Sequence, residues 1–348
     1  MKQKSFPRFL VFHSDNRKSK NPKWVGVLAI FVLLVGCVGM AHAQQAGKVA
    51  RIGFLDSSTA SGMAVLIDAF RQELIKLGWI EGKNITIEYR FAELKNERLS
   101  ELAADLVRLK VDLIVTSGGA TPSAAKGATS TIPIVMTSSV DPVGTGLVVS
   151  LARPGGNVTG YASLTPELNT KRLEILKDAL PRLARVAFLF QGRGVAAELQ
   201  LKELRTAALA LKLKLEEIET QPDTKGLESA FQIAKQKQVG AIMTFTGIRF
   251  FAERKRIVEI AGKYRLPAIY PQKEYVDEGG LMSYGVDYDD LYRKAAHYVD
   301  KILKGAKPVD LPVQQATKFE FVINLKAAKQ IGLTLPPELL ARANRVNK

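Results

Sequence analysis

Short apolar runs rich in β-branched residues alternate with longer amphipathic stretches from residue 48 onward. In the first half of the chain this pattern predicts strands at 51–55, 84–89, 111–116 and 133–136, and helices at 63–77, 98–109 and 122–128. Regular alternation of strand and helix is typical of βαβ units, whose strands run parallel and are covered by helices. We therefore predict an α/β lobe with four parallel strands and three crossover connections.

The second half of the chain repeats this plan. The runs at 185–190, 239–247 and 267–270 resemble those at 51–56, 111–119 and 133–136, at offsets of 134, 128 and 134 residues. A repeat of this length is a whole lobe and not a solenoid module. Buried parallel strands resemble one another in any protein, which leaves coincidence as an alternative. We predict two Rossmann-like open parallel-sheet lobes in tandem.

Two Gly-rich segments are candidates for the connections between the lobes. The first, 141–160, contains Gly155-Gly156, which permits a sharp turn; the second, 278–285, precedes an amphipathic helix at 288–303. Two narrow chain crossings between two lobes are typical of a hinge. The predicted boundaries are lobe 1 at 44–156, lobe 2 at 157–285, and 286–348 as the crossing back to lobe 1 and the C-terminal segment. The lobe on which 317–348 packs stays open.

The first 43 residues have the layout of an export signal. They carry seven basic residues and one acidic residue, with an uncharged apolar run at 25–41 that ends in Ala41-His42-Ala43, the pattern accepted by signal peptidase I. The run is short for a membrane span, so we expect cleavage after Ala43 and a periplasmic or extracytoplasmic location. One alternative is an uncleaved anchor. The other is lipoprotein processing at 34–37, with the lipid on Cys37.

The basic excess of the chain does not by itself indicate a nucleic-acid partner. The 50 Lys and Arg against 34 Asp and Glu give a formal net charge of +16. Removal of the signal would take away seven basic residues and one acidic residue, leaving +10 over 305 residues. The densest basic cluster, at 249–256, has a helical spacing that turns its charges outward and Phe250 and Phe251 inward. We interpret it as a solvated helix face and predict no nucleic-acid partner.

The familiar catalytic and cofactor motifs are missing. The sequence contains no G-x-S-x-G, no H-E-x-x-H and no Walker A loop, and no G-x-G-x-x-G follows the first strand. His297 is the only histidine after residue 43 and lies in a predicted helix, where we expect a structural or solvated role. We predict no enzymatic activity, no cofactor and no metal. Catalysis by carboxylates alone is not excluded by missing motifs, although no carboxylate pair stands out.

Hydroxyl and glycine residues follow the strands of the first lobe. The carboxyl ends of parallel strands meet at the edge where open α/β sheets bind ligands, and hydroxyls there can hold an anion such as a carboxylate. Serine and threonine at such turns also serve as ordinary helix N-caps, so each one taken alone is ambiguous. The first-lobe candidates for ligand binding are Ser57, Ser58, Ser117, Gly118, Thr137, Ser138 and Asp141.

The corresponding edge of the second lobe supplies amide, hydroxyl and aromatic groups. Phe245 and Tyr270 would cover a ligand, although either residue is equally suited to a core or rim position. Asp287, just after the second crossing, would pair with an ammonium group. The candidates from the second half are Gln191, Thr244, Phe245, Tyr270 and Asp287.

Several segments together resemble the ABC-transporter substrate-binding protein family that includes tryptophan- and phenylalanine-binding members. The most specific is Leu-Ala-Arg-Pro-Gly-Gly-Asn-Val-Thr-Gly at 151–160, supported by 141–148, 251–258, 266–270 and 279–285. The match covers nearly all of the chain after the signal. It departs from the family at 190–195, where an Asn-Pro-containing loop is common and this chain has Arg193, which would add a positive contact.

The resemblance implies a type I periplasmic-binding-protein fold whose two lobes close on a small ligand without catalysis. We therefore expect an exported solute-binding protein that delivers an amino acid or other carboxylate to an ABC permease and its ATPase, and that is a monomer. The alternative is an extracytoplasmic sensing subunit for a membrane receptor or kinase. Transcriptional repressors share the two-lobed architecture, but they need an N-terminal DNA-binding headpiece where this chain has a signal.

Overall fold

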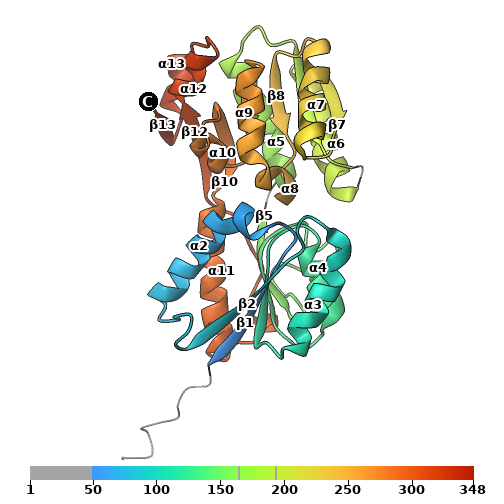
Figure 1. The fold of residues 1–348 in the computed structure, drawn as a ribbon, viewed down its shortest axis with the longest axis vertical. Helices are drawn as coiled ribbons and strands as arrows, with labels where there is room; N and C mark the ends of the chain where they lie inside the picture. The colour runs from blue at the N-terminus through green and yellow to red at the C-terminus, as the bar shows by residue number, and fades with distance from the viewer. Residues whose placement is uncertain (1–48, 164, 193) are drawn as a thin grey trace, which may run out of the picture. The chain divides into compact units, whose positions relative to one another are not determined.

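Two parallel-dominated sheets form the framework of the computed structural model, which describes residues 49–163, 165–192 and 194–348 (Figure 1). The predicted signal at 1–43, including Cys37, and the predicted contact Arg193 lie outside the described residues. Residues 49–348 form one unit. The α/β class and the two open sheets of the predicted fold are confirmed.

The first sheet has six strands in the order β11-β5-β4-β3-β1-β2, all paired in parallel. Its strands are β1 Ala50–Asp56, β2 Ile85–Phe91, β3 Leu113–Thr116, β4 Ile134–Val140, β5 Val158–Ser163 and β11 Gln314–Gln315. Its helices are α2 Ala60–Lys76, α3 Leu99–Arg108, α4 Thr121–Ala128 and α11 Tyr288–Leu303, with 3-10 turns at Asn96–Arg98 and Pro308–Asp310.

The second sheet has seven strands in the order β13-β12-β10-β9-β8-β6-β7, parallel except where β10 meets β12. Its strands are β6 Arg185–Phe190, β7 Lys214–Glu219, β8 Ala241–Thr244, β9 Ala268–Tyr270, β10 Met282–Val286, β12 Phe319–Asn324 and β13 Arg345–Asn347. Its helices are α5 Thr165–Ala179, α6 Val195–Ala210, α7 Thr224–Gln236, α8 Ile248–Ala252, α9 Arg254–Lys263, α10 Lys273–Asp277, α12 Leu325–Gln330 and α13 Pro337–Ala341.

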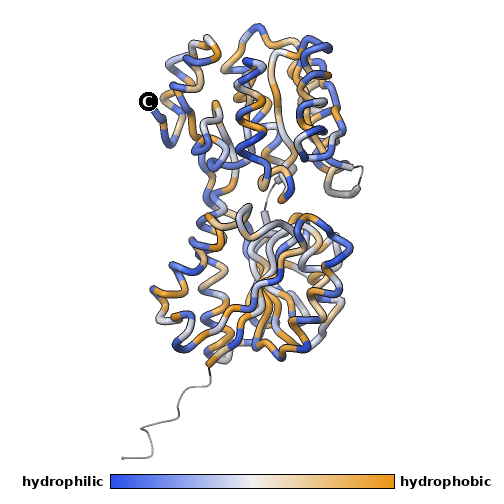
Figure 2. Tube along the Cα trace, viewed as in Figure 1, coloured by the Kyte–Doolittle hydropathy of each residue, from blue (hydrophilic) through white to orange (hydrophobic). Residues whose placement is uncertain are grey.

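Each sheet is covered on both faces by helices with one apolar side. Helix α3 buries Leu99, Leu102, Ala103 and Leu106, the i, i+3, i+4, i+7 positions of a helical stripe. In the first lobe α2 and α11 cover one face and α3 and α4 the other; in the second lobe α7 and α9 lie opposite α5 and α6. Figure 2 shows the matching alternation of apolar and polar positions along these helices. The sheets are therefore buried on both faces, as parallel strands require.

The chain passes between the sheets three times, after β5, after β10 and after β11. Two crossings were predicted from the sequence, and the structure has three. The Gly-rich segment 141–157 is not a crossing, because Leu147 and Val148 are buried in the first-lobe core and β5 returns to pair with β4. The predicted start of lobe 2 at residue 157 thus falls too early, since the first sheet extends to Ser163. Residues 319–324 and 345–347 add two strands to the second sheet, which assigns the C-terminal segment to that lobe.

No helix among the described residues is long and apolar enough to cross a membrane.

Replacement of Gly160 by alanine should lower the free energy of unfolding by at least about 2 kcal/mol, because alanine would add both backbone strain and a steric clash. Gly160 has φ +127°, and a Cβ there would lie 2.2 Å from the backbone oxygen of Met136 in the neighbouring strand. Gly156→Ala is the matched control, because a Cβ at Gly156 meets nothing within 4 Å. Urea unfolding of both variants tests this; equal stability of the two would contradict the strain argument.

Candidate functional site

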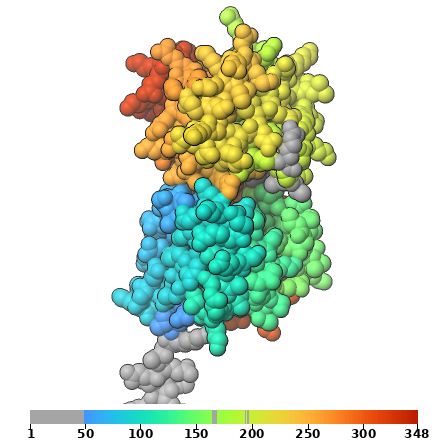
Figure 3. Space-filling model, turned by 45° about the vertical axis from the view of Figure 1, so that its right-hand side comes forward, coloured from blue at the N-terminus to red at the C-terminus, as the bar shows by residue number. Residues whose placement is uncertain are grey.

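A cavity of about 490 Å³ lies where the carboxyl ends of the two sheets face each other. The first lobe contributes polar and apolar groups from the loops after its strands and from α2: Ser57, Met63, Leu66, Gly118, Ser138 and Asp141. The second lobe contributes mainly amide, aromatic and hydroxyl groups: Gln191, Gln200, Phe245, Thr246, Arg249 and Gln272. Tyr288 and Tyr292 of α11 complete the wall. Figure 3 shows the two lobes meeting across this boundary, the first mainly in blue to green and the second mainly in yellow to orange.

An irregularity in β4 explains which hydroxyls of this strand reach the cavity. Residues 137–139 were predicted to follow the strand, but β4 continues to Val140 and its register against β5 shifts between Met136 and Ser139. A bulge of this kind changes the direction in which the following side chains point. Ser138 lines the cavity, whereas Thr137 is fully buried beneath it.

The β1–α2 loop is held in place by backbone hydrogen bonds from the loop after β2. The N–H groups of Glu93 and Leu94 donate to the carbonyl oxygens of Ser58 and Ser57 at 3.1 and 2.9 Å. Thr59 then caps α2 by accepting from the N–H of Gly62 at 3.0 Å. Because the loop carbonyls are occupied in this way, Ser57 remains at the cavity wall in a fixed position.

Asp56 is a buried carboxyl beneath the first-lobe wall. Its Oδ1 accepts from the N–H of Ser58 at 2.7 Å, while Oδ2 has no hydrogen-bond partner among the described residues. Burial raises the pKa of Asp56 to about 6, against the opposing effects of the Ser58 N–H and the Ser117 hydroxyl. Its charge contributes to raising the pKa of Tyr292, a cavity residue. The first lobe therefore places negative charge under the cavity at neutral pH.

Arg172 of α5 is a buried guanidinium beside the second-lobe wall. Its Nε donates to the carbonyl oxygen of Tyr284 at 2.6 Å, and its Nη1 donates to Asn169 Oδ1 at 2.6 Å and to Thr246 Oγ1 at 3.3 Å. Burial lowers the pKa of Arg172 to about 10, so it stays charged at neutral pH. Gln200 accepts from the N–H of Thr246 at 3.1 Å, which ties this cavity residue to α6 as well.

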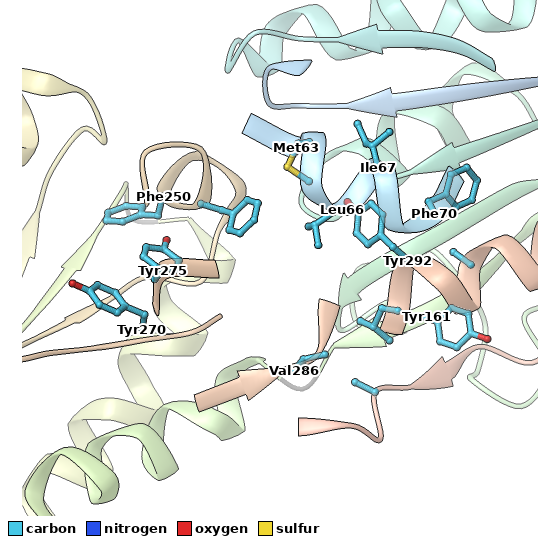
Figure 4. Packing of buried hydrophobic residues seen from close by; sticks show 14 of the residues in the cluster. Met63, Leu66, Ile67, Phe70, Tyr161, Phe250, Tyr270, Tyr275, Val286 and Tyr292 are labelled. Carbon is cyan, nitrogen blue, oxygen red and sulfur yellow. The ribbon is translucent and has the colours of Figure 1, made fainter. Parts of the chain in front are cut away.

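Apolar side chains of α2 and α8 bring the two lobes together beside the cavity. Met63 and Leu66 belong to the same buried cluster as Phe250 and Phe251, and Figure 4 shows Leu66 beside Tyr292 on the side of α2 that faces Phe250. Across this boundary Arg254 Nη1 donates to the carbonyl oxygen of Gly62 at 3.1 Å. The cavity is thus bounded on this side by a packed contact between the lobes.

Six of the twelve predicted binding residues line the cavity. They are Ser57, Gly118, Ser138, Asp141, Gln191 and Phe245. The other six are buried next to it or in the lobe cores: Ser58, Ser117, Thr137, Thr244, Tyr270 and Asp287. The structure therefore brings the two predicted sheet edges together but turns half of the predicted side chains away from the cavity.

Local packing explains the two largest of these differences. Tyr270 stacks on Tyr275 with ring centroids 4.7 Å apart inside the second lobe, so it does not cover the cavity. Asp287 is the N-cap of α11, accepting from the N–H of Asp290 at 3.0 Å, and it also pairs with Lys318 Nζ at 2.6 Å. Its carboxylate is already used by the fold, and its pKa is held below its usual value by these partners despite its burial.

The basic cluster at 249–256 does not form a uniform solvated face. Phe250 and Phe251 are buried as predicted, and Lys255 and Arg256 are exposed. Arg249 instead lines the cavity, and Arg254 reaches across to α2. His297 lies at the surface with Nε2 3.1 Å from Glu73 Oε1, and neither residue lines the cavity.

The cavity residues that the sequence did not single out include two glutamines and two tyrosines, Gln200, Gln272, Tyr288 and Tyr292. Tyr288 and Tyr292 belong to the helix predicted at 288–303, and Gln272 follows the strand-like run at 267–270. Glutamine and tyrosine are also common at such positions without a binding role. Arg172 gave no signal, because an arginine in an amphipathic helix is most often solvated. The position of Gln272 directly after the strand ending at Tyr270 was the one available indication.

Comparisons with known proteins agree with this geometry. The sequence model described as "ABC transporter substrate binding protein" matches residues 54–347. The chain is 29% identical over 272 residues to a tyrosine-binding protein of Clostridioides difficile (strain R20291), covering 76% of this chain and 75% of the relative.

Two solved structures share its fold over most of their length. A conserved domain protein from Vibrio cholerae O1 biovar El Tor N16961 superposes with a TM-score of 0.79 at 29% identity, covering 86% of this chain and all of the other. An ABC domain in complex with L-Trp from Streptococcus pneumoniae superposes with a TM-score of 0.76 at 26% identity, covering 85% of this chain and 99% of the other. The type I periplasmic-binding-protein fold is confirmed.

Replacement of Asp56 by asparagine should stabilise the protein above pH 6 and leave it unchanged near pH 4. The folded-state pKa of about 6 lies above the unfolded value of 3.8, so the folded protein binds the extra proton between these values. Its stability therefore falls as pH rises through this window and stays lower above it. The expected gain at pH 7.5 is roughly 2–3 kcal/mol, at 1.4 kcal/mol per pH unit.

Urea unfolding at pH 4, 6 and 7.5 measures the difference. Asp68→Asn is the control, because Asp68 is exposed on the neighbouring helix α2. A gain for Asp56→Asn that is the same at all three pH values would contradict the buried, high-pKa carboxyl.

Proposed function

This chain belongs to the ABC transporter substrate-binding protein family, and we propose that it captures a small α-amino acid or another carboxylate between its two lobes. The observation that carries the proposal is the cavity of about 490 Å³ between the carboxyl ends of both sheets. A cavity of this volume suits a small organic molecule, and its wall combines apolar surface with a few polar groups. The tyrosine-binding relative and the L-Trp complex support an amino acid as the ligand.

Both walls would contact the ligand in the closed protein. Ser57, Gly118 and Ser138 would offer hydroxyl and backbone groups, and Phe245, whose ring lies 6.0 Å from that of Phe250, would cover an apolar side chain. Because the two walls come from different lobes, a ligand that touches both binds the closed arrangement more tightly than the open one. Capture would therefore be coupled to lobe closure through the three crossings.

A thermal-shift screen of the twenty amino acids, with organic acids and aromatic carboxylates, tests capture on ligand-free protein. At least one amino acid should raise the melting temperature, because binding to the folded state alone stabilises it by about 2.7 kcal/mol at a ligand concentration 100 times Kd. Refolding from urea removes any carried-over ligand first. If no compound raises the melting temperature, capture of a small carboxylate is wrong.

Phe245→Ala should weaken the binding of the compound found in the screen by about 10- to 100-fold, because it removes an apolar contact worth about 1.5–3 kcal/mol. Leu209→Ala is the matched control, since Leu209 is an 81% exposed residue of the same lobe. Isothermal titration measures both. Equal losses in the two variants would place the ligand outside this cavity.

The proposed partners are an ABC permease and its ATPase, with the protein working as an extracytoplasmic monomer. The family description supports the transporter context. Cleavage after Ala43 would release the protein, and a lipid on Cys37 would tether it; both forms place it on the outer side of the membrane.

Affinity capture from solubilised membranes of the source organism should recover the permease and ATPase subunits together. The ligand-saturated protein should recover more than the ligand-free protein, because the closed form presents both lobes in one arrangement. The ligand-free protein serves as the control for non-specific capture. Recovery of a membrane kinase or receptor in their place would favour the sensing-subunit alternative.

A further inference from the structure

The charged side chains of the cavity wall are separated by lobe. Among the described lining residues only Asp141 and Arg249 are charged, the first on lobe 1 and the second on lobe 2. All other lining groups are hydroxyl, amide, aromatic or aliphatic. The wall therefore has a negative side and a positive side, which suits a ligand that carries both charges.

Arg249 is the positive group at the wall, and its guanidinium has no partner within the described residues. Its side chain forms no hydrogen bond or ion pair with a described residue, and its Nε is buried without an acceptor among those residues. The flanking Phe250 and Phe251 are 0% and 2% exposed, so they anchor the short helix α8 and fix where Arg249 leaves the backbone. A buried donor without an acceptor is costly, and a bound carboxylate would satisfy it.

Arg172 adds a second positive charge behind the same wall. Its Nη1 donates a hydrogen bond to Thr246, which lines the cavity. All its hydrogen-bond acceptors are neutral: a backbone carbonyl, an amide and a hydroxyl. The field of this wall is thus positive and not neutralised by a bonded carboxylate of the described chain.

The first-lobe wall has the opposite sign. Asp141 adopts φ 49° at the end of β4, where its Oδ1 accepts from the N–H of Gly144 at 2.8 Å. Asp56 lies beneath the wall with a buried Oδ2 that has no hydrogen-bond partner in the described part of the chain. The groups that interact with Asp56 are the backbone N–H of Ser58, the hydroxyl of Ser117 and Tyr292, none of which carries a positive charge.

We propose that the cavity binds an α-amino acid in one orientation, with its carboxylate on the lobe 2 wall at Arg249 and its ammonium towards Asp141 and Asp56 on lobe 1. This inference rests on the proposed capture of an amino acid. It reverses the orientation expected from the hydroxyls of lobe 1, because a carboxylate placed there would face two carboxyl groups. It also removes the need for Asp287, which is bound to Lys318.

The test compares three compounds that differ only in their charged groups. For L-tyrosine they are the amino acid, tyramine without the carboxylate, and 3-(4-hydroxyphenyl)propionate without the ammonium; L-tryptophan and any other amino acid from the screen receive the same set. Arg249→Gln should weaken the binding of the amino acid and of the acid by about 10- to 100-fold, because it removes a charge-assisted hydrogen bond. The affinity for the amine should stay unchanged. Asp141→Asn should weaken the binding of the amino acid and of the amine by up to about fivefold and leave the affinity for the acid unchanged.

Lys255→Gln and Asp310→Asn are the matched controls, because they make the same charge changes at exposed residues outside the cavity wall. Asp141→Asn keeps the Oδ1 acceptor for Gly144, and Arg249→Lys should restore part of the acid binding. The orientation is wrong if an amino acid binds but Arg249→Gln weakens the binding of the amine or leaves the affinity for the acid unchanged. If none of the twenty amino acids binds the wild-type protein, the proposed capture itself is wrong and the orientation falls with it.

Discussion

A buried guanidinium is the constraint on which the geometry of the second lobe depends. Arg172 belongs to α5, which follows the first crossing; it bonds to Tyr284 in β10, which precedes the second crossing, and to Thr246 at the cavity. One side chain therefore links two of the three crossings to the cavity wall. A charge with only neutral acceptors is expensive to bury, so its position is fixed by the directions of those acceptors. Any movement of α5 against β10 would break bonds that water cannot replace at this depth.

The first lobe controls the cavity by different means. Its wall is set by backbone hydrogen bonds between two loops and by the bulge in β4, which sends Ser138 outward and Thr137 inward. These features are local to one sheet and do not depend on the crossings. The apolar contact of Met63 and Leu66 with the α8 phenylalanines then joins this rigid wall to the second lobe. The cavity therefore lies between a first-lobe wall held by backbone hydrogen bonds and a second-lobe wall held by the side-chain hydrogen bonds of Arg172 near the crossings.

The period of apolar residues was enough to predict β1 to β4, the helices α2, α3, α4 and α11, and the two-lobed class, because buried parallel strands and the apolar side of a helix have characteristic sequence periods. The crossings were predicted less well. Glycine and proline at 141–157 indicate turns, but they do not tell a crossing from a loop that returns to its own sheet; Leu147 and Val148, buried in the first lobe, decide it. At the site, the sequence located both sheet edges. It could not tell Ser138 from Thr137, or predict that Tyr270 faces the core, because the bulge and the Tyr270–Tyr275 stack are set by tertiary packing.

Asp56 shows why a binding wall is not the most stable arrangement of its residues. Burial opposes its ionisation, and the unpartnered Oδ2 adds a further cost, so above pH 6 the ligand-free fold carries an unfavourable charge under the cavity. On the other wall, Arg249 has a buried Nε without an acceptor among the described residues, and burial also disfavours the charge of Arg172. A ligand bearing both charges would lower all of these costs at once, whereas an anion or a cation alone would lower those of one wall and raise those of the other. In the proposed orientation, this separation of charge between the lobes would favour closure around a ligand of matching polarity.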